Sequence, residues 1–100
     1  MPDNFQKWDV WFAYVPYDDG GGKERAVIII DEQRVLVLRV YGAPSLNGDY
    51  EIQEWGYANL NKESEVSLIP LCIPKSNFRR KIGSLHIADK RKLLKALYNI

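Results

Sequence analysis

Short apolar runs along the chain alternate with turn-forming residues, a pattern typical of β structure. The first run, residues 8–15 (WDVWFAYV), is apolar on both alternating faces apart from Asp9, which predicts a central strand buried on two sides. Further strands are predicted over residues 25–30, 33–41, 50–55, 65–69 and 78–85. Turn chemistry predicts a hairpin at Asn47-Gly48 and a bulge at Gly83, and Pro70 and Pro74 indicate an edge or bend.

The period changes at residues 86–100, where Ile87, Leu94 and Leu97 share one face of a predicted amphipathic helix of about three turns. His86 or Ser84 could cap it, and Asp89 suits the positive end of the helix dipole. The predicted fold class is therefore mainly β with a C-terminal helix, as one domain over residues 1–100. We expect a curled antiparallel sheet of roughly five to seven strands.

Composition narrows the class of protein. The chain is 46% hydrophobic and 12% aromatic, which excludes the profile of a disordered chain. Residues 1–7 are polar and no apolar run reaches membrane-spanning length, so neither a signal peptide nor a membrane segment is expected. The single cysteine, Cys72, lies in an apolar stretch, which predicts a buried thiol in a reducing cytoplasm. One Cys and one His cannot form a zinc-type ligand set, so no metal or other cofactor is predicted.

Charge is divided unevenly along the chain, although its formal net charge is only +1. Residues 1–74 carry six Lys/Arg against twelve Asp/Glu, whereas residues 75–100 carry eight against one. Such segregation favours a polyanionic partner, either nucleic acid or an acidic protein segment. The alternative is a solvated basic helix face.

A glycine-rich loop, residues 20–22, delivers Lys23 and Arg25 to the start of an apolar strand. Arginine can donate two parallel hydrogen bonds to phosphate oxygens, so Arg25 at a rigid strand suits binding of a phosphodiester. The simpler interpretation is that both cations only charge a strand end.

Four fragments in order resemble the PemK/MazF-like toxins of bacterial toxin–antitoxin pairs, over almost the full chain. These are Asp9-Val10-Trp11, the 22–29 stretch GKERAVII, the 54–64 block with Glu54-Trp55, Asn59-Leu60, Lys62 and Ser64, and Ile82-Gly83-Ser84-Leu85 followed by Asp89. The resemblance implies a small SH3-like antiparallel barrel of the PemK/MazF/CcdB type and a homodimer. It also implies a metal-independent endoribonuclease of single-stranded RNA, silenced by a cognate antitoxin protein.

The resemblance also implies roles for individual residues. Arg25 matches the family's catalytic arginine, with Lys23 adding positive field and Tyr41 or Ser64 in supporting catalytic roles. Tyr41 stands where many members have threonine; a tyrosine hydroxyl can donate to phosphate but is a poor base at neutral pH. Tyr41 could equally be an aromatic platform or a barrel residue. The predicted RNA-binding residues are Asp19, Gly22, Arg39, Trp55, Ser67, Arg79, Arg80 and Lys81.

Two functions remain open at this point. The first is an RNA-cleaving toxin. The second is a barrel that has lost catalysis and binds nucleic acid or protein, which the departures from the family pattern favour: Tyr41 stands in place of a threonine and Ser67 in place of an arginine, and Ala26 also replaces a proline. His86 is interpreted as a helix cap or exposed residue rather than a general base.

Overall fold

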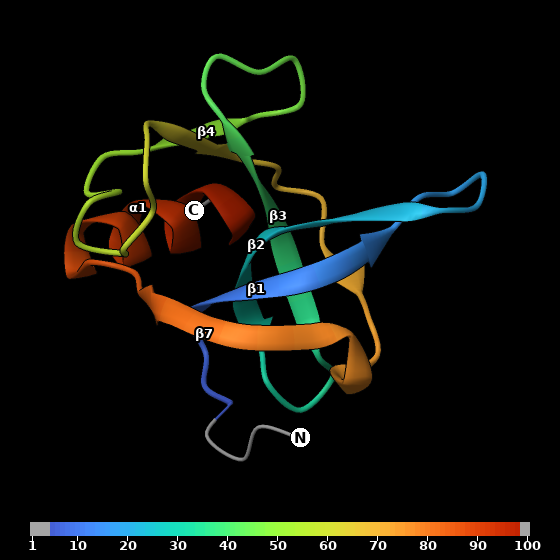
Figure 1. Ribbon diagram of the computed structural model, residues 1–100. Helices are drawn as coiled ribbons and strands as arrows, with labels where there is room; N and C mark the ends of the chain where they lie inside the picture. Colours follow the sequence, from blue (N-terminus) through green and yellow to red (C-terminus); the bar gives the residue numbers. More distant parts are fainter. Residues whose placement is uncertain (1–4, 99–100) are drawn as a thin grey trace.

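The computed structural model describes residues 5–98 of the chain. These residues form an antiparallel sheet followed by one α-helix, which is the last element in sequence (Figure 1). The elements are β1 (Asp9–Pro16), β2 (Gly22–Asp31), β3 (Leu36–Gly42), β4 (Tyr50–Ile52), β5 (Ser64–Val66), β6 (Leu71–Cys72), the 3-10 turn η1 (Lys75–Asn77), β7 (Phe78–Ser84) and α1 (Ile87–Tyr98). The strand order is β4-β5-β3-β2-β1-β7, and β6 pairs with β3. The predicted class, mainly β with a C-terminal helix, is confirmed. Barrel closure stays a prediction, because within residues 5–98 no pairing joins β4 to β7.

Strand β1 is buried on both faces, as its sequence predicts. Alternate residues of a strand point to opposite faces of the sheet, so Val10 and Trp11 enter different clusters. The cluster of Val10 also contains Ile28, Leu38, Val66 and Leu93. The cluster of Trp11 also contains Ala13, Val27, Ile29, Val37, Ile73 and Phe78. Helix α1 covers the first face, and the segment around Ile73 packs on the second.

Helix α1 is fixed to the sheet through Asp89, which is fully buried. The Asp89 carboxylate accepts hydrogen bonds from the Tyr50 hydroxyl at 2.7 Å and from the backbone N–H groups of Gln53 and Glu54 at 3.0 and 2.9 Å. Burial raises the pKa of the Tyr50 hydroxyl well above its usual range, and the hydrogen bond to Asp89 and its negative charge raise it further. The predicted dipole role of Asp89 is thus secondary to this anchoring role.

The buried face of α1 differs from the predicted one. Leu93 is fully buried and Leu97 packs beside it, whereas Ile87 and Leu94 are exposed. The reason is that Asp89 fixes the rotation of the helix, so the residue four positions later faces the core. His86 caps the helix as predicted, because its Nδ1 accepts a hydrogen bond from the Ala88 N–H at 3.1 Å. Residues 99–100 of the predicted helix lie outside the described residues.

Two predictions around β4 are wrong because β5 and Asp89, both distant in sequence, contact this region. β5 lies between β3 and β4, so Asn47-Gly48 belongs to a longer loop and not to a two-residue hairpin. The strand predicted over 50–55 ends at Ile52, since the next two N–H groups bond to Asp89 instead of a neighbouring strand.

Cys72 is exposed, contrary to the predicted burial. It lies on the short edge strand β6, where Leu71 and Ile73 turn inward and the residue between them turns outward. Its thiol lies 3.3 Å from the Arg34 carbonyl oxygen, to which it donates a hydrogen bond. Pro70 and Pro74 flank this edge strand, as their missing N–H groups predict.

Candidate active site

The structure brings two of the predicted catalytic residues into contact. The Arg25 guanidinium on β2 lies over the Tyr41 ring on β3, with Cζ 4.3 Å from the ring centre. The same guanidinium donates a hydrogen bond to the Val40 carbonyl at 3.4 Å. Stacking and the hydrogen bond both restrict the half-buried Arg25 side chain, and most of its five N–H donors stay available to a ligand.

Two further predicted cations face the same side of the sheet as this pair. Lys23 precedes Arg25 by two residues on β2, and Arg39 precedes Tyr41 by two residues on β3, so the period of two places all four on one face. The Lys23 side chain is exposed. Arg39 is half-buried, and its Nε is buried without a hydrogen-bond partner among residues 5–98. The face therefore concentrates positive charge around Tyr41.

Glu65 is a functional candidate that sequence reasoning missed. It pairs directly with Tyr41 across β3 and β5, so the two side chains face the same side. Its Oε1 is buried and has no hydrogen-bond partner in the described part of the chain. The side chain lies against Gly48, where it leaves no room for a Cβ, and it borders a surface cavity of about 260 Å³. A carboxylate in this place can accept a proton.

The two predicted serines are buried and engaged elsewhere. The Ser64 hydroxyl donates to the Lys62 carbonyl at 2.9 Å, and its position next to Glu65 on β5 turns it to the opposite face. Ser67 is also buried, and its Oγ accepts a hydrogen bond from the Ile69 N–H at 3.4 Å. Neither hydroxyl lies beside the Arg25–Tyr41 pair.

Three other predicted RNA-binding residues lie at positions that the local structure explains: Asp19, Gly22 and Trp55. Asp19 is exposed in the β1–β2 turn, which projects from the body of the molecule (Figure 1). Gly22 lies opposite Pro16, and a Cβ there would collide with the Tyr14 ring and the Val15 carbonyl. This close packing explains the glycine without any ligand. Trp55 is half-buried against the first core cluster, so only part of its ring could reach a ligand.

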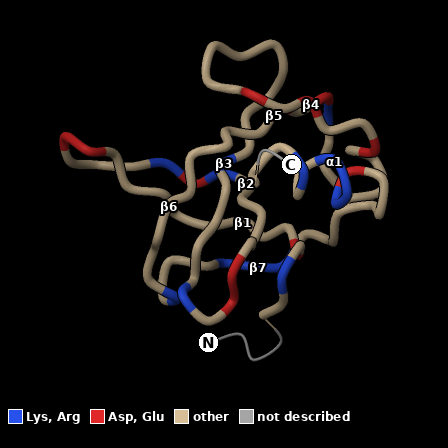
Figure 2. Tube along the Cα trace, turned by 180° about the vertical axis from the view of Figure 1, so that it is seen from behind, with Lys and Arg blue, Asp and Glu red and all other residues tan. Residues whose placement is uncertain are grey.

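The predicted basic residues of β7 lie apart from the Arg25–Tyr41 pair. Arg79 forms an ion pair with Glu24 at 3.1 Å, Arg80 lies over the Phe12 ring at 5.5 Å, and Lys81 lies 3.4 Å from Asp9. Figure 2 shows basic residues gathered on β7 and α1, and acidic residues at the tip of the β1–β2 hairpin. The structure thus forms two basic regions, one on β2 and β3 and one on β7 and α1.

No family model matches the chain, and no curated protein matches it. Among residues 5–98, no group of three or more His, Cys, Asp or Glu side chains is arranged to hold a metal ion. At 12 residues α1 is too short to span a bilayer, and the described part of the chain has no other helix that could.

Proposed function

We propose that the protein is a PemK/MazF-like toxin with an SH3-like barrel, an endoribonuclease that cleaves single-stranded RNA without a metal ion. The observation that carries the proposal is the Arg25–Tyr41 pair, a restrained guanidinium with free donors beside a phenol hydroxyl. Lys23 and Arg39 add positive charge on the same face, and Glu65 supplies a carboxylate across from Tyr41.

The reaction follows from these groups. The 2′-hydroxyl of the RNA attacks the adjacent phosphorus and gives its proton to Glu65. The bond from phosphorus to the 5′-oxygen breaks, and Tyr41 donates its proton to that oxygen. Arg25 donates hydrogen bonds to the phosphate oxygens, whose negative charge grows in the transition state. The products are a 2′,3′-cyclic phosphate and a 5′-hydroxyl end.

The first experiment is cleavage of a long mixed-sequence RNA in EDTA by the native protein and by Arg25→Ala. We expect Arg25→Ala to lower the cleavage rate by about 10²–10³-fold, because it removes the main donors to the transition state. Arg34→Ala is the matched control, since that side chain is 80% exposed on a distant turn. A 2′-deoxy substitution at the cut site must block cleavage. Equal rates for native protein and Arg25→Ala would contradict the proposal.

A second candidate function has its own support. The predicted hydroxyls of Ser64 and Ser67 are buried and engaged by backbone groups. A barrel with this arrangement would bind nucleic acid or a protein partner without cutting. RNA binding by the native protein with no cleavage in any buffer would favour this function.

The proposal extends to partners and location. A homodimer is supported by large apolar side chains that remain exposed, among them Ile87, Leu94 and Tyr98 on α1. The cognate antitoxin would be an acidic or apolar segment that occupies the RNA-binding face. A cytoplasmic location follows from an RNA substrate. Sedimentation that shows a monomer at micromolar concentration would contradict the dimer.

A further inference from the structure

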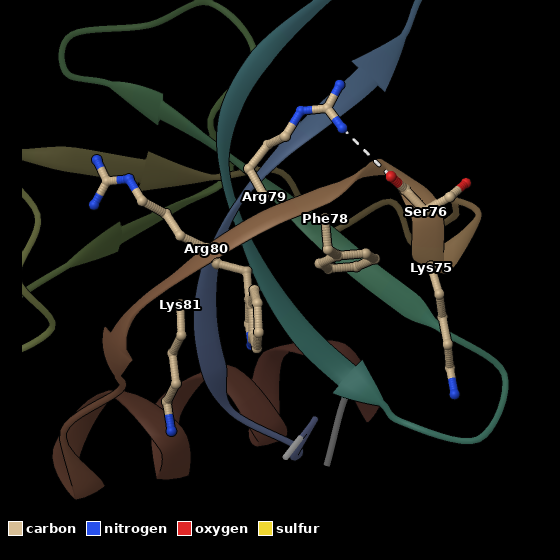
Figure 3. Close-up of a pocket in the computed structure, with 7 residues that line it drawn as sticks. Lys75, Ser76, Phe78, Arg79, Arg80 and Lys81 are labelled. Carbon is tan, nitrogen blue, oxygen red and sulfur yellow. Dashed lines mark hydrogen bonds between the residues drawn. The ribbon is translucent and has the colours of Figure 1, made fainter. Parts of the chain in front are cut away.

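A second opening lies beside β7, with a volume of about 610 Å³ (Figure 3). Four cations line it, Lys75, Arg79, Arg80 and Lys81, together with Trp11, Phe78 and Ser76. None of these residues belongs to the Arg25–Tyr41 pair or contacts it through a hydrogen bond given above. Its volume lies within the range of small-molecule sites, about 300–1,000 Å³.

The indole of Trp11 supplies an unused donor at this opening. Trp11 is only 4% exposed, and its Nε1–H has no hydrogen-bond partner among the described residues. A buried indole N–H normally has an acceptor, because leaving it unpaired costs the hydrogen bond that water would have given. Trp11 therefore lines the pocket and carries a buried donor that has no acceptor among the described residues.

Lys81 lies opposite Trp11 in the sheet and is restrained by an ion pair. It pairs directly with Trp11 across β1 and β7, and its Nζ lies 3.4 Å from Asp9 Oδ1. Asp9 is itself buried, and its carboxylate also accepts hydrogen bonds from Ser84 Oγ and the Gln6 N–H, both at 3.1 Å. The Asp9-Val10-Trp11 motif thus contributes both the donor and the carboxylate that positions the neighbouring cation.

The balance of charge at the opening is positive. Asp9 neutralises Lys81, and Glu24 forms an ion pair with Arg79. Lys75 and Arg80 have no carboxylate within ion-pairing distance in the described part of the chain. Figure 3 shows the Lys75 and Lys81 side chains extending to one side of β7 and the Arg79 and Arg80 side chains extending away from them.

We propose that this pocket binds a phosphate group, with Trp11 Nε1–H and Lys81 as its donors and Lys75 as a further cation. Arg80 lies over the Phe12 ring and is not counted among the donors. The lone pairs of a carboxylate lie in one plane, whereas the oxygens of a phosphate are arranged tetrahedrally and accept hydrogen bonds from several directions. The phosphate could come from an RNA backbone or from a small phosphate compound. The site does not rest on the proposed cleavage, because its donors take no part in that reaction.

The test observes the tryptophan indole N–H signals of the full-length ¹⁵N-labelled protein by NMR. The chain has three tryptophans, and Trp11→Phe identifies the signal of interest. If that variant does not fold, Trp8→Phe and Trp55→Phe assign the signal by elimination.

The binding measurement is a titration with inorganic phosphate at constant ionic strength. We expect a saturable shift of the Trp11 signal, and at least about tenfold weaker binding in Lys81→Gln. Lys92→Gln, an exposed cation of α1, is the matched control.

A second arm replaces phosphate with a 2′-O-methyl RNA oligomer that lacks terminal phosphates. This oligomer has no free 2′-hydroxyl, so the arm reports binding even if the proposed cleavage fails. A shift of the same signal with both probes supports an RNA phosphodiester as the source. A shift with inorganic phosphate alone supports a small phosphate ligand. The proposal is overturned if neither probe moves the Trp11 signal, or if Lys81→Gln binds phosphate as tightly as the native protein.

Discussion

At the scale of single residues, the contact between Arg25 and Tyr41 gives the tyrosine two separable roles. Its ring restrains the guanidinium through stacking, and its hydroxyl can donate a proton. If the protein has the proposed activity, these two roles account for a tyrosine where the resembled family has threonine. It offers a donor at the same strand end and adds a surface against which the arginine is held.

Glu65 is the residue whose role depends most on the proposed chemistry. We expect Glu65→Gln to lower the cleavage rate by about 10²–10⁴-fold, because the amide keeps the shape of the side chain but cannot take the proton of the 2′-hydroxyl. Single-turnover cleavage across a range of pH measures this, with thermal unfolding of each variant recorded alongside. Glu51→Gln is the matched control, since Glu51 pairs with Glu65 across β4 and β5 but is exposed. Cleavage at the native rate by Glu65→Gln would leave another group as the base.

Arg25 and Tyr41 could be predicted as candidate site residues from the sequence, whereas Glu65 could not, for a physical reason. Arg25 follows a glycine loop and Tyr41 ends an apolar strand, so both are marked by local pattern. Glu65 becomes a neighbour of Tyr41 only because β5 enters the sheet next to β3, a pairing between segments over 20 residues apart that local pattern does not specify. The burial of Ser64 follows from the same register, because the residue before Glu65 must face the other side.

At the scale of elements, α1 shows how one buried carboxylate can decide what periodicity leaves open. The apolar residues of the helix allow more than one buried face, since Ile87, Leu93, Leu94 and Leu97 surround much of it. The hydrogen bonds to Asp89 from Tyr50 and the 53–54 backbone select the face that contains Leu93. Periodicity therefore predicted the helix correctly and its orientation incorrectly.

The Tyr50–Asp89 contact makes the docking of α1 sensitive to alkaline pH. Burial and Asp89 raise the pKa of Tyr50, so the folded protein keeps this proton at a pH where the unfolded chain, with an ordinary tyrosine pKa of about 10, loses it. The contribution of Tyr50 to the free energy of unfolding is thus complete below about pH 10. Above that it declines by about 1.4 kcal/mol per pH unit.

Urea unfolding of the native protein and Tyr50→Phe between pH 8 and 11 measures this effect. At pH 8 we expect Tyr50→Phe to be less stable by about 1.5–3 kcal/mol, the typical value of a hydrogen bond to a charged group. The difference should shrink as the pH rises above about 10. Tyr57→Phe controls for the exposed tyrosines, because Tyr57 is on the surface. A difference that stays constant up to pH 11 would show that the Tyr50 proton does not couple to folding.

At the scale of the whole molecule, folding keeps most of the charge division that the sequence carries, although Glu24 and Asp9 pair with Arg79 and Lys81. Asp89 is the only acidic residue of residues 75–100, and it is buried. The surface of this segment therefore carries eight Lys/Arg and no acidic residue of its own. The segment forms η1, β7 and α1, so the cations lie in two groups, around the β7 opening and along the helix (Figure 2). Sequence alone predicted a polyanionic partner but could not separate these groups.

The salt dependence of RNA binding distinguishes the two groups of cations. Each phosphate contact with a single strand contributes a slope of about −0.7 to log K against log salt, because binding releases condensed counterions. If the cations of β7 contact the RNA backbone, replacing Arg79, Arg80 and Lys81 with Gln should make the slope less steep by about 2.

The matched control replaces Lys90, Lys92 and Lys95 with Gln. It changes the net charge by the same amount, and it should leave the slope nearly unchanged. Fluorescence anisotropy with a 2′-O-methyl oligomer between 50 and 300 mM NaCl measures both variants without cleavage. An equal loss of slope in the two variants would mean that RNA binds through the overall positive charge of residues 75–100. The β7 opening would then have no particular part in RNA binding.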